Sequence, residues 1–375
     1  MRIGIDATAM PRQPVGAGIY MINLVRTLAE LKKDFDLIVF HHRSANEQLG
    51  PGNNHKFLSV EITDRSPAAR IIWEQAFLPQ LARRYKLDLL HSLHYTRPYF
   101  LPCASVVTFH DMTFFLYPML HTRAKRLLFP LAMRASAKRA NALIAVSENT
   151  RQDVIRMMGI PSEKIFTTQL GVIEDFRPIT DTSNTQEISR KYKLPEKFIL
   201  YVGLVEPRKN IPLLLRSFNE LVAQGLTQDL VIVGRPGWSF EEVFDLVENL
   251  NLTPRVHFPG YISRQELPFV YNLAALFVYP TLYEGFGLPV LEAMACGIPT
   301  VTSRVASIPE IIGDAGIMVP PGDQPALTQA MREVLTNDRL RQELTHRGPQ
   351  RAIKFTWKRT AEETLKVYRQ VLKIS

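Results

Sequence analysis

Short apolar runs alternate with longer amphipathic stretches along almost the whole chain, and this alternation restricts the fold more than any other feature. A short apolar run that ends in Gly, Asp or Ser predicts a buried strand, and an amphipathic stretch with a period near 3.6 predicts a helix. In the first half, the expected strands are residues 2–6, 37–40, 89–92, 106–111 and 142–147, and the expected helices are residues 18–31 and 73–85. Strand, helix and strand in series favour a parallel sheet with helices on both faces.

The alternation resumes after a polar segment, residues 178–189, which has few residues able to build a core and is predicted to be a linker. Beyond it, the expected strands are residues 198–202, 230–234, 256–259, 276–279, 300–302 and 317–319, with helices beginning at Ile211, Phe240, Arg264 and Leu288. The sequence therefore predicts an α/β fold of two doubly wound, Rossmann-like domains. We place them at residues 1–178 and 190–355, and expect the amphipathic C-terminal stretch, residues 356–375, to form a helix that packs back on the first domain.

Ligands of open parallel sheets bind outside the carboxyl ends of the strands, so we expect both domains to direct their loops into one cleft. Composition agrees with a globular chain, since the 375 residues are 46% hydrophobic and 22% charged. The only two cysteines, Cys103 and Cys296, lie far apart in the chain, which argues against a disulfide scaffold or a structural zinc site and favours a reducing compartment.

No run reaches about 18 consecutive apolar residues, so we expect no membrane-spanning helix. The N-terminal residues lack the basic, apolar and small-residue regions of a leader, so we expect a cytoplasmic protein.

Positive charge is concentrated in the first half of the chain. The formal net charge is +9, and residues 1–175 carry 22 Lys and Arg against 15 Asp and Glu, while the remainder carries 23 against 21. The excess peaks in a stretch where basic residues alternate with apolar ones at helical spacing: Arg123, Lys125, Arg126, Leu127, Leu128, Leu131, Met133, Arg134, Lys138 and Arg139. Two interpretations stay open here, a solvated helix face and a peripheral contact with an anionic membrane surface.

The most informative segment is Thr-Leu-Tyr-Glu-Gly-Phe-Gly-Leu-Pro-Val-Leu-Glu-Ala-Met-Ala-Cys-Gly-Ile-Pro-Thr, residues 281–300. A strand ends before it, a Gly-Phe-Gly turn follows, Pro289 fits a first helical turn, and Gly297 stops the helix. Backbone N–H groups at such a helix N-terminus bind phosphate or sugar oxygens. Glu284 precedes the turn and Glu292 lies two helical turns on, so both can face one ligand. The alternative is a tight strand-to-helix connection with two incidental acids.

A second segment, Tyr-Val-Gly-Leu-Val-Glu-Pro-Arg-Lys-Asn at residues 201–210, runs from a strand into a turn with two adjacent cations. The planar fork of Arg208 and the point charge of Lys209 together suit a diphosphate, although such a pair can also be a solvated surface pair. In the first half, the apolar strand at residues 106–111 ends in His110 and Asp111, which places an imidazole at the carboxyl edge of the sheet.

The loop at residues 14–20 contains Gly16 and Gly18, where a phosphate or another ligand can approach the backbone. The same glycines begin a dinucleotide fingerprint, but Met21 stands where its third glycine belongs, so a NAD site is disfavoured. Asp34-Phe35-Asp36 has the spacing of a metal-binding DxD motif, but it precedes its strand and is predicted to be a turn. We therefore expect no metal and no other cofactor.

Glu284 and Glu292, with seven residues between them in the setting Tyr-Glu-Gly-Phe-Gly-Leu-Pro-Val-Leu-Glu-Ala-Met-Ala-Cys-Gly-Ile-Pro, resemble the signature of the retaining family 4 (group 1) glycosyltransferases of GT-B fold. The resemblance extends over the whole chain, and the chain is similar in particular to bacterial mannosyltransferases that build lipopolysaccharide O-antigen and related surface polysaccharides.

The resemblance implies a role for each of these residues. Glu284 and His110 would be catalytic residues close to the donor sugar; Arg208, Lys209 and Gly16 would bind the donor diphosphate; Gly285, Phe286, Gly287, Leu288 and, as a weaker candidate, Asp111 would bind the donor sugar; Glu292 would bind the ribose; and the region of Gly260 and Tyr261 would bind the nucleobase. Many members carry an Arg directly after the glycine of the 201–210 segment. Leu204 stands there in this chain, so Arg208 or another residue must supply that contact.

The resemblance thus predicts an enzyme that moves a hexose, best assigned as mannose from GDP-mannose, to a saccharide acceptor carried on a lipid. The first domain would hold the acceptor, the basic stretch could meet the inner face of the cytoplasmic membrane, and we expect no nucleic-acid partner. The alternatives are a transferase that uses a UDP- or ADP-sugar, an epimerase or phosphorylase with the same two-sheet architecture, and a non-catalytic sugar-nucleotide-binding component of a polysaccharide assembly complex.

Overall fold

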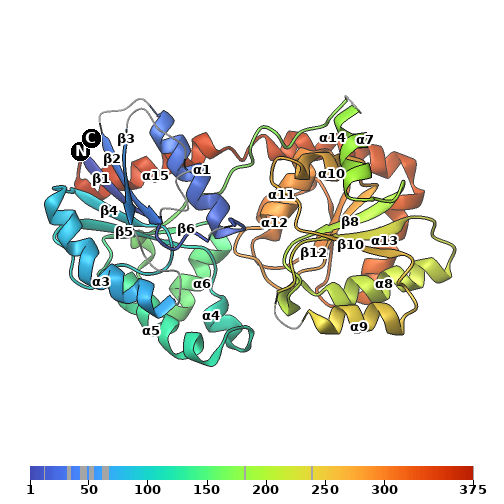
Figure 1. Cartoon of the computed structure of the whole chain (residues 1–375), viewed down its shortest axis with the longest axis horizontal. Helices are drawn as coiled ribbons and strands as arrows, with labels where there is room; N and C mark the ends of the chain where they lie inside the picture. The colour runs from blue at the N-terminus through green and yellow to red at the C-terminus, as the bar shows by residue number, and fades with distance from the viewer. Residues whose placement is uncertain are drawn as a thin grey trace. The chain divides into compact units, whose positions relative to one another are not determined.

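The computed structural model describes residues 1–11, 13–31, 35–42, 49, 55–60, 67–180, 183–237 and 240–374 (Figure 1). The chain divides into two compact units. Unit 1 comprises Met1–Gly171 together with Thr356–Ser375, and unit 2 comprises Val172–Phe355.

Unit 1 is built on a parallel seven-stranded sheet with the order β3-β2-β1-β4-β5-β6-β7. Its strands are β1 (Arg2–Asp6), β2 (Asp36–His42), β3 (His55–Val60), β4 (Leu89–Ser92), β5 (Ala104–Phe109), β6 (Ala142–Ala145) and β7 (Ile165–Thr167). Its α-helices are α1 (Ala17–Glu30), α3 (Pro67–Arg84), α4 (Thr113–Leu116), α5 (Arg123–Arg139), α6 (Glu148–Met158) and α15 (Trp357–Leu372), and η2 (Pro118–Leu120) and η3 (Ser162–Lys164) are 3-10 turns. The central strands are buried on both faces, which is why they are almost continuous apolar runs.

Helix α15 belongs to unit 1 although it lies at the other end of the sequence (Figure 1). It begins where the Thr356 side chain accepts a hydrogen bond from the N–H of Arg359, and it packs against α1, β5 and β6. The Tyr368 hydroxyl lies 2.6 Å from Nδ1 of His91 at the end of β4, and Thr360 donates to the Gln169 carbonyl at 2.6 Å. One helix face is therefore fixed to the sheet by both apolar packing and buried hydrogen bonds.

Unit 2 repeats the architecture with a parallel six-stranded sheet of order β10-β9-β8-β11-β12-β13. Its strands are β8 (Phe198–Val202), β9 (Asp229–Val233), β10 (Val256–Gly260), β11 (Leu276–Tyr279), β12 (Thr300–Ser303) and β13 (Ile317–Val319). Its helices are α7 (Ser183–Lys191), α8 (Ile211–Ala223), α9 (Glu241–Asn249), α10 (Leu267–Leu273), α11 (Leu288–Ala295), α12 (Ile308–Ile312), α13 (Gln324–Thr336) and α14 (Asp338–Ala352), with a 3-10 turn η4 (Pro207–Lys209). The predicted α/β class with two doubly wound sheets is confirmed.

In each sheet the strand that comes first in the chain lies in the interior of the sheet, between two other strands. The chain adds strands first on one side of it and later on the other. The connections from β1 lead first to β2 on one side and later to β4 on the other, and β8 lies in the same way between β9 and β11. Such a reversal of strand order leaves a crevice at the carboxyl ends, where ligands of these folds bind. Ligand-binding residues are therefore expected in the loops after β1 and β4 and in those after β8 and β11.

The linker prediction for residues 178–189 is wrong in its second part. Residues 181–182 lie outside the described chain, but Ser183–Lys191 form helix α7, which packs against α10 within unit 2. Thr185 and Ile188 are buried there, and Lys191 and Tyr192 both bind Glu266. One buried isoleucine and these polar contacts anchor a helix whose composition, taken alone, is that of a linker.

Two edge strands, β3 and β7, were not predicted from the sequence. Both lie at the margin of the first sheet, where pairing to one neighbour is enough to hold a strand of ordinary composition. Strand β5 also ends earlier than predicted, at Phe109, so His110 and Asp111 lie just beyond its carboxyl end. No helix in the described ranges is long and apolar enough to cross a membrane.

Candidate functional site

Two loops meet at the carboxyl edge of unit 2, one after β8 and one after β11. The N–H of Leu282 donates to the Arg208 carbonyl at 2.8 Å, and Nη1 of Arg208 donates to the Tyr283 carbonyl at 2.6 Å. The Thr281 hydroxyl lies 3.2 Å from the same Arg208 carbonyl. Because β8 and β11 are neighbours at the point where the strand order reverses, segments some 75 positions apart in sequence form one site.

Glu284 is the centre of a charge cluster in this site. Its Oε1 lies 2.6 Å from Nζ of Lys209 and 2.9 Å from Nη1 of Arg208, and it also accepts from the Tyr279 hydroxyl at 3.1 Å and the Thr281 hydroxyl at 2.9 Å. Glu284 is only 8% exposed. Burial alone would raise the pKa of this carboxyl, but the charges of Arg208 and Lys209 outweigh it and lower the pKa to about 2.

All four of these contacts end on one carboxylate oxygen. Oε1 of Glu284 accepts from two cations and two hydroxyls, which leaves Oε2 for a further donor. Arg208 is also held from its other side by Glu206, whose Oε1 lies 2.6 Å from Nη2. Glu284 on the one hand, and Arg208 and Lys209 on the other, were predicted from separate sequence segments, and the structure brings them together. Tyr279 and Thr281 also belong to the cluster and were not predicted from the sequence.

The glycine turn after Glu284 adopts a conformation that favours glycine at position 287. Gly287 has φ 112° and ψ 46°, and a Cβ at this position would lie 2.7 Å from Cδ1 of Ile308. The Ser307 hydroxyl lies 2.9 Å from the Glu284 carbonyl and 2.6 Å from the Phe286 carbonyl, so it holds both ends of the turn. Helix α11 begins directly afterwards, and the first N–H groups of a helix have no acceptor within the helix. The sugar-binding role assigned to residues 285–288 stays a prediction.

Glu292 belongs to a different cluster. It is 2% exposed, its Oε1 lies 2.6 Å from Nη1 of Arg264, and its Oε2 accepts from the Tyr271 hydroxyl at 3.2 Å. Its ribose-binding role is a prediction that these contacts leave open. Sequence reasoning missed Arg264, although its position just after the predicted strand at residues 256–259 was a usable signal.

Tyr261 directly follows β10 and is 41% exposed. The guanidinium carbon of Arg235, which lies in the loop after β9, is 4.5 Å from the centre of its ring. The assignment of Tyr261 and Gly260 to the nucleobase stays a prediction, and Arg235 was not singled out from the sequence.

In unit 1, His110 lies half-buried just beyond β5, with its ring centroid 5.0 Å from that of Tyr20. Its Nε2 is 2.7 Å from the Leu93 carbonyl, and since a carbonyl only accepts, Nε2 carries the hydrogen. Burial lowers the pKa of His110, so the ring is neutral near pH 7 and Nδ1 is its acceptor. A neutral imidazole with a fixed tautomer can accept one hydrogen bond from a ligand hydroxyl; its role towards the donor sugar stays a prediction.

The other two residues predicted in unit 1 have different surroundings. Asp111 accepts from the N–H and the hydroxyl of Thr113 at 3.0 and 2.8 Å, so it stabilises the turn into α4. Gly16 is exposed at the start of α1 with φ 50°, and the space beside it is open. The backbone can therefore be approached closely at Gly16, as a phosphate ligand would require.

The predicted turn at the DxD spacing is described in part. Asp34 lies outside the described residues, and Asp36 begins β2, with its carboxylate 3.3 Å from Nε of Arg2. In the ranges that the structure describes, no three His, Cys, Asp or Glu side chains gather so as to hold a metal ion.

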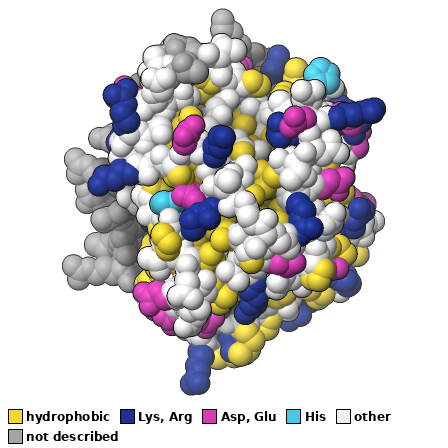
Figure 2. All heavy atoms as spheres, turned by 90° about the vertical axis from the view of Figure 1, so that its right-hand side faces the viewer, with side chains coloured by type: hydrophobic (Ala, Val, Ile, Leu, Met, Phe, Trp, Pro, Cys, Tyr) yellow, Lys and Arg dark blue, Asp and Glu magenta, His cyan; other side chains and the backbone are white. Residues whose placement is uncertain are grey.

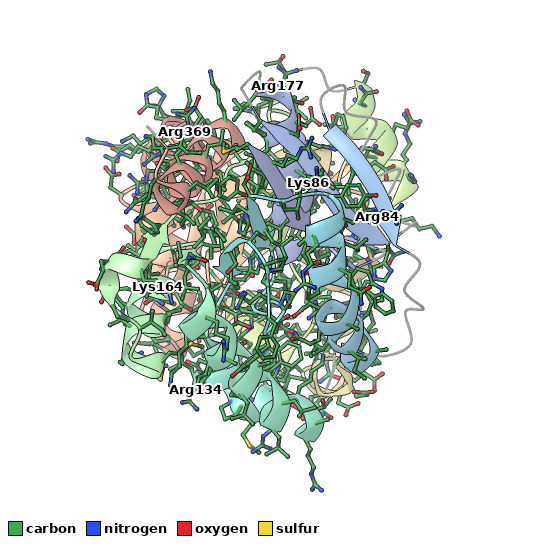
Figure 3. All side chains as sticks on the ribbon, turned by 90° about the vertical axis from the view of Figure 1, so that its left-hand side faces the viewer. Arg84, Lys86, Arg134, Lys164, Arg177 and Arg369 are labelled. Carbon is green, nitrogen blue, oxygen red and sulfur yellow. The ribbon has the colours of Figure 1, made fainter. Side chains whose placement is uncertain are left out.

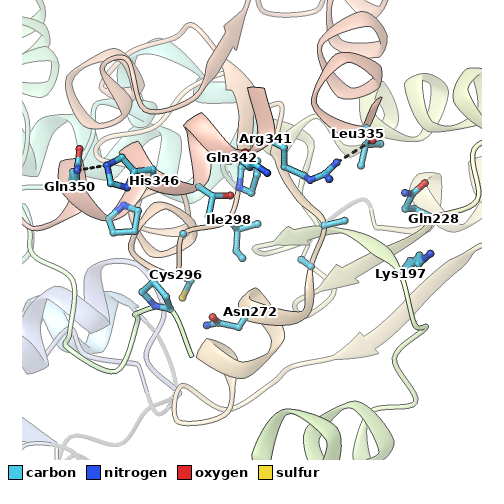
Figure 4. Close-up of a pocket in the computed structure, with 17 residues that line it drawn as sticks. Lys197, Gln228, Asn272, Cys296, Ile298, Leu335, Arg341, Gln342, His346 and Gln350 are labelled. Carbon is cyan, nitrogen blue, oxygen red and sulfur yellow. Dashed lines mark hydrogen bonds between the residues drawn. The ribbon is translucent and has the colours of Figure 1, made fainter. Parts of the chain in front are cut away.

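A pocket of about 950 Å³ opens in unit 2 at the opposite edge of the sheet (Figure 4). Lys197, Ala275 and Pro299 line it just before β8, β11 and β12, together with His346 of α14. It therefore lies at the amino ends of the strands and is separate from the Glu284 cluster. On the face of unit 2 seen in Figure 2, Lys and Arg side chains are interspersed with Asp and Glu, without one extended patch of a single sign.

Both units are doubly wound sheets, and a cation–carboxylate cluster and a glycine turn lie at the switch point of the second sheet. This arrangement agrees with the GT-B class of glycosyltransferases. Residues 184–351 match the family described as "Glycosyl transferases group 1", and residues 14–176 match "Glycosyltransferase Family 4". The chain therefore belongs to the group 1 glycosyltransferases, with a family 4 glycosyltransferase N-terminal part, and is a hexosyltransferase.

Among its relatives, O-antigen chain mannosyltransferase B of Escherichia coli is 32% identical over 97% of this chain and 99% of the relative. O-antigen chain mannosyltransferase RfbU of Salmonella typhimurium is 27% identical over 88% and 90% of the two chains. Among solved structures, sucrose-phosphate synthase from Thermosynechococcus elongatus has a TM-score of 0.81 at 22% identity over the full length of both chains. WaaG, a glycosyltransferase involved in lipopolysaccharide biosynthesis, has a TM-score of 0.75 at 17% identity over 97% and 99%. The GT-B fold is thereby confirmed.

Proposed function

We propose that this protein transfers mannose from GDP-mannose, with retention of the anomeric configuration, to a saccharide acceptor carried on a lipid during the synthesis of a surface polysaccharide. The similarity to two O-antigen mannosyltransferases supports the sugar and the process. The observation that carries the proposal is the cluster of Arg208, Lys209 and Glu284 at the switch point of unit 2, beside the start of α11.

The cluster supplies what departure of a nucleoside diphosphate requires. When the bond between the anomeric carbon and the phosphate oxygen breaks, the electron pair leaves with the diphosphate, the new bond forms to the oxygen of the acceptor hydroxyl, and the proton of that hydroxyl passes to the departing diphosphate. Arg208, Lys209 and the N-terminus of α11 would stabilise the growing negative charge. Oε2 of Glu284, which has no partner among the contacts above, would accept a hydrogen bond from a hydroxyl of the sugar and hold it in place.

The remaining assignments complete the proposed donor site: the turn at residues 285–288 and His110 for the sugar, with Asp111 as the weaker candidate; Gly16 for the diphosphate; Glu292 for the ribose; and Tyr261 for the base. The reaction is proposed to need neither a metal ion nor another cofactor, because the cations and the helix N-terminus carry the positive charge that a metal would otherwise supply.

The test is a transfer assay with purified protein, lipid-linked saccharides and a panel of GDP-, UDP- and ADP-sugars, with and without EDTA. We expect an α-linked mannosyl product from GDP-mannose, identified by NMR, at a rate that EDTA does not change. A product formed only from a UDP- or ADP-sugar would show that the donor is not GDP-mannose. A β-linked product would overturn retention, and loss of activity in EDTA would overturn metal independence. If Arg208→Ala preserved the protein's cellular role, the non-catalytic alternative would be correct.

A peripheral membrane contact is the second part of the proposal, and helix α5 supports it. Its inner face is buried through Phe129 and Met133, yet its outer face exposes Leu127, Leu128 and Leu131 at 72%, 56% and 66%. Basic residues flank this stripe, and Arg134 among them projects from unit 1 in Figure 3. A helix that is apolar on its outer face and bordered by cations fits the interface of an anionic bilayer at the cytoplasmic side.

Vesicle co-sedimentation tests this contact. We expect binding to vesicles of phosphatidylglycerol and phosphatidylcholine but not of phosphatidylcholine alone, and loss of binding when Leu127, Leu128 and Leu131 are all replaced by Ser. Equal binding of the triple variant, or none by the wild type, would leave the outer face of α5 as a solvated surface.

A further inference from the structure

Arg235 lies at the carboxyl edge of unit 2, and no carboxylate among the described residues forms an ion pair with it. Its Nε and Nη2 are buried, and neither has a hydrogen-bond partner in the described part of the chain. Buried donors of this kind are rare in native proteins and costly to leave unpaired, so each needs an explanation. Nε and Nη2 together form the side of the guanidinium that binds two acceptors at once.

The backbone around Arg235 is fixed next to the proposed donor site. The Arg235 carbonyl accepts from the N–H of Val205, which lies three residues before Arg208, and the N–H of Gly234 donates to the Gly260 carbonyl at 3.0 Å. Gly234 allows this packing, because a Cβ there would lie 1.8 Å from the Gly203 carbonyl oxygen. The loops after β8, β9 and β10 are thus joined, with Arg235 between the diphosphate cations and Tyr261 in the order of the sheet.

The surroundings of Arg235 suit a planar base better than a phosphate. Its guanidinium lies over the ring of Tyr261, whose 41% exposure leaves aromatic surface for a ligand. Arg235 is itself only half-buried, so rotation about its outer torsions would turn Nε and Nη2 towards a base beside Tyr261. A phosphate already has Arg208, Lys209 and the start of α11 on the neighbouring loops.

Guanine matches this pair of donors in a way that other bases do not. It presents two adjacent acceptors, O6 and N7, which arginine binds in a bidentate manner, whereas adenine presents an acceptor beside an N–H₂ donor. Uracil presents a single carbonyl on the corresponding edge. We propose that Arg235 selects the guanine base of the donor by donating from Nε and Nη2 to O6 and N7; this inference rests on the GDP-sugar donor proposed above.

The experiment is calorimetric titration of the full chain with GDP, UDP, ADP and 7-deaza-GDP, in which a C–H group replaces N7. The variants are Arg235→Ala and Arg235→Lys, and Arg216→Ala, on the exposed side of α8, is the matched control. We expect the wild type and the control to bind GDP about tenfold or more tightly than 7-deaza-GDP and UDP. Both Arg235 variants should bind the four nucleotides within about threefold of one another, since lysine cannot donate to both acceptors.

Each outcome separates the inference from the proposed function. If the wild type prefers GDP but is indifferent to N7, or if Arg235→Ala keeps the preference, Arg235 does not read the base, while the GDP donor stands. If Arg235→Ala weakens all four nucleotides equally, Arg235 binds the diphosphate and the inference is wrong. If the wild type prefers UDP or ADP, the proposed donor fails and the inference with it. The wild-type comparison with 7-deaza-GDP keeps the inference falsifiable even if the variants do not fold, because indifference to N7 overturns it.

Discussion

Replacing Glu284 by Gln should destabilise the free protein and strengthen its binding of GDP. In the structure Glu284 neutralises Arg208 and Lys209, the two cations proposed to bind the donor diphosphate. The carboxylate therefore occupies the cations that the ligand needs. Gln keeps the size and one acceptor of the side chain but removes its charge.

The size of the effect follows from the pKa of Glu284. Lowering it from 4.5 to about 2 corresponds to about 3 kcal/mol in favour of the charged form, and because Glu284 is 8% exposed, solvent screens little of this. A depressed carboxyl pKa contributes stability above about pH 4.5 and loses it as the pH falls towards about 2. At pH 7 we therefore expect Glu284→Gln to lower the unfolding free energy by up to about 3 kcal/mol, or Tm by roughly 5–10 °C.

The gain in ligand binding has the same origin. In the wild type GDP must draw the cations away from Glu284, whereas in the variant they are without that partner, so GDP affinity should rise by about ten- to a hundredfold. Mannosyl transfer should fall, because the sugar loses its proposed acceptor. Calorimetry with GDP and thermal unfolding at pH 7 measure both effects, with Glu241→Gln on the exposed side of α9 as the control. GDP affinity that is unchanged or weaker in Glu284→Gln, beside a normal control, would show that Glu284 does not compete with the diphosphate for these cations.

Three further predictions concern single residues. Gly287→Ala should cost about 1–3 kcal/mol in urea unfolding, since φ is 112° and the added Cβ meets Ile308; a loss below about 0.5 kcal/mol would show that the turn can relax. Burial, with the charge of His110, lowers the pKa of His91 to about 3. Below about pH 6.5 the unfolded chain therefore binds a proton at His91 that the folded chain does not bind, and the stability should decrease as the pH falls. His91→Asn should make that pH dependence shallower, and an unchanged slope would contradict the assignment. Arg264→Ala should cost about 3 kcal/mol because it leaves the Glu292 carboxylate buried without its cation, and adding Glu292→Gln should restore part of this loss; no recovery in the double variant would argue against the pair.

Prediction from the sequence succeeded where the signal is local. The strands at residues 89–92, 198–202, 276–279 and 317–319 were predicted with the bounds that the structure has, because a buried parallel strand is a short apolar run wherever it occurs. The turn and helix after Glu284 were predicted for a similar reason, since Gly287, Pro289 and Gly297 constrain the backbone directly.

It failed where stability comes from elsewhere in the fold. Helix α7 has little apolar character of its own and exists because it packs against α10, with Ile188 buried, and because Glu266 binds the residues at its end. Strands β3 and β7 depend on one neighbour each at the sheet edge. No periodicity within such segments distinguishes them from loops, so only the assembled unit determines them.

Local sequence patterns suffice for the α/β class, the order of the elements and the motif residues, because helix and strand periods and glycine turns are properties of neighbouring residues. Which of these residues act together depends on the tertiary structure. Glu284 meets Arg208 and Lys209 because β8 and β11 are neighbours, and Arg235 meets Tyr261 because β9 and β10 are neighbours. Glu292 of α11 meets Arg264, which lies between β10 and α10, through the packing of elements that are not neighbours in the sheet. Contacts between loops depend on strand order and register, and these are set by the packing of the whole sheet.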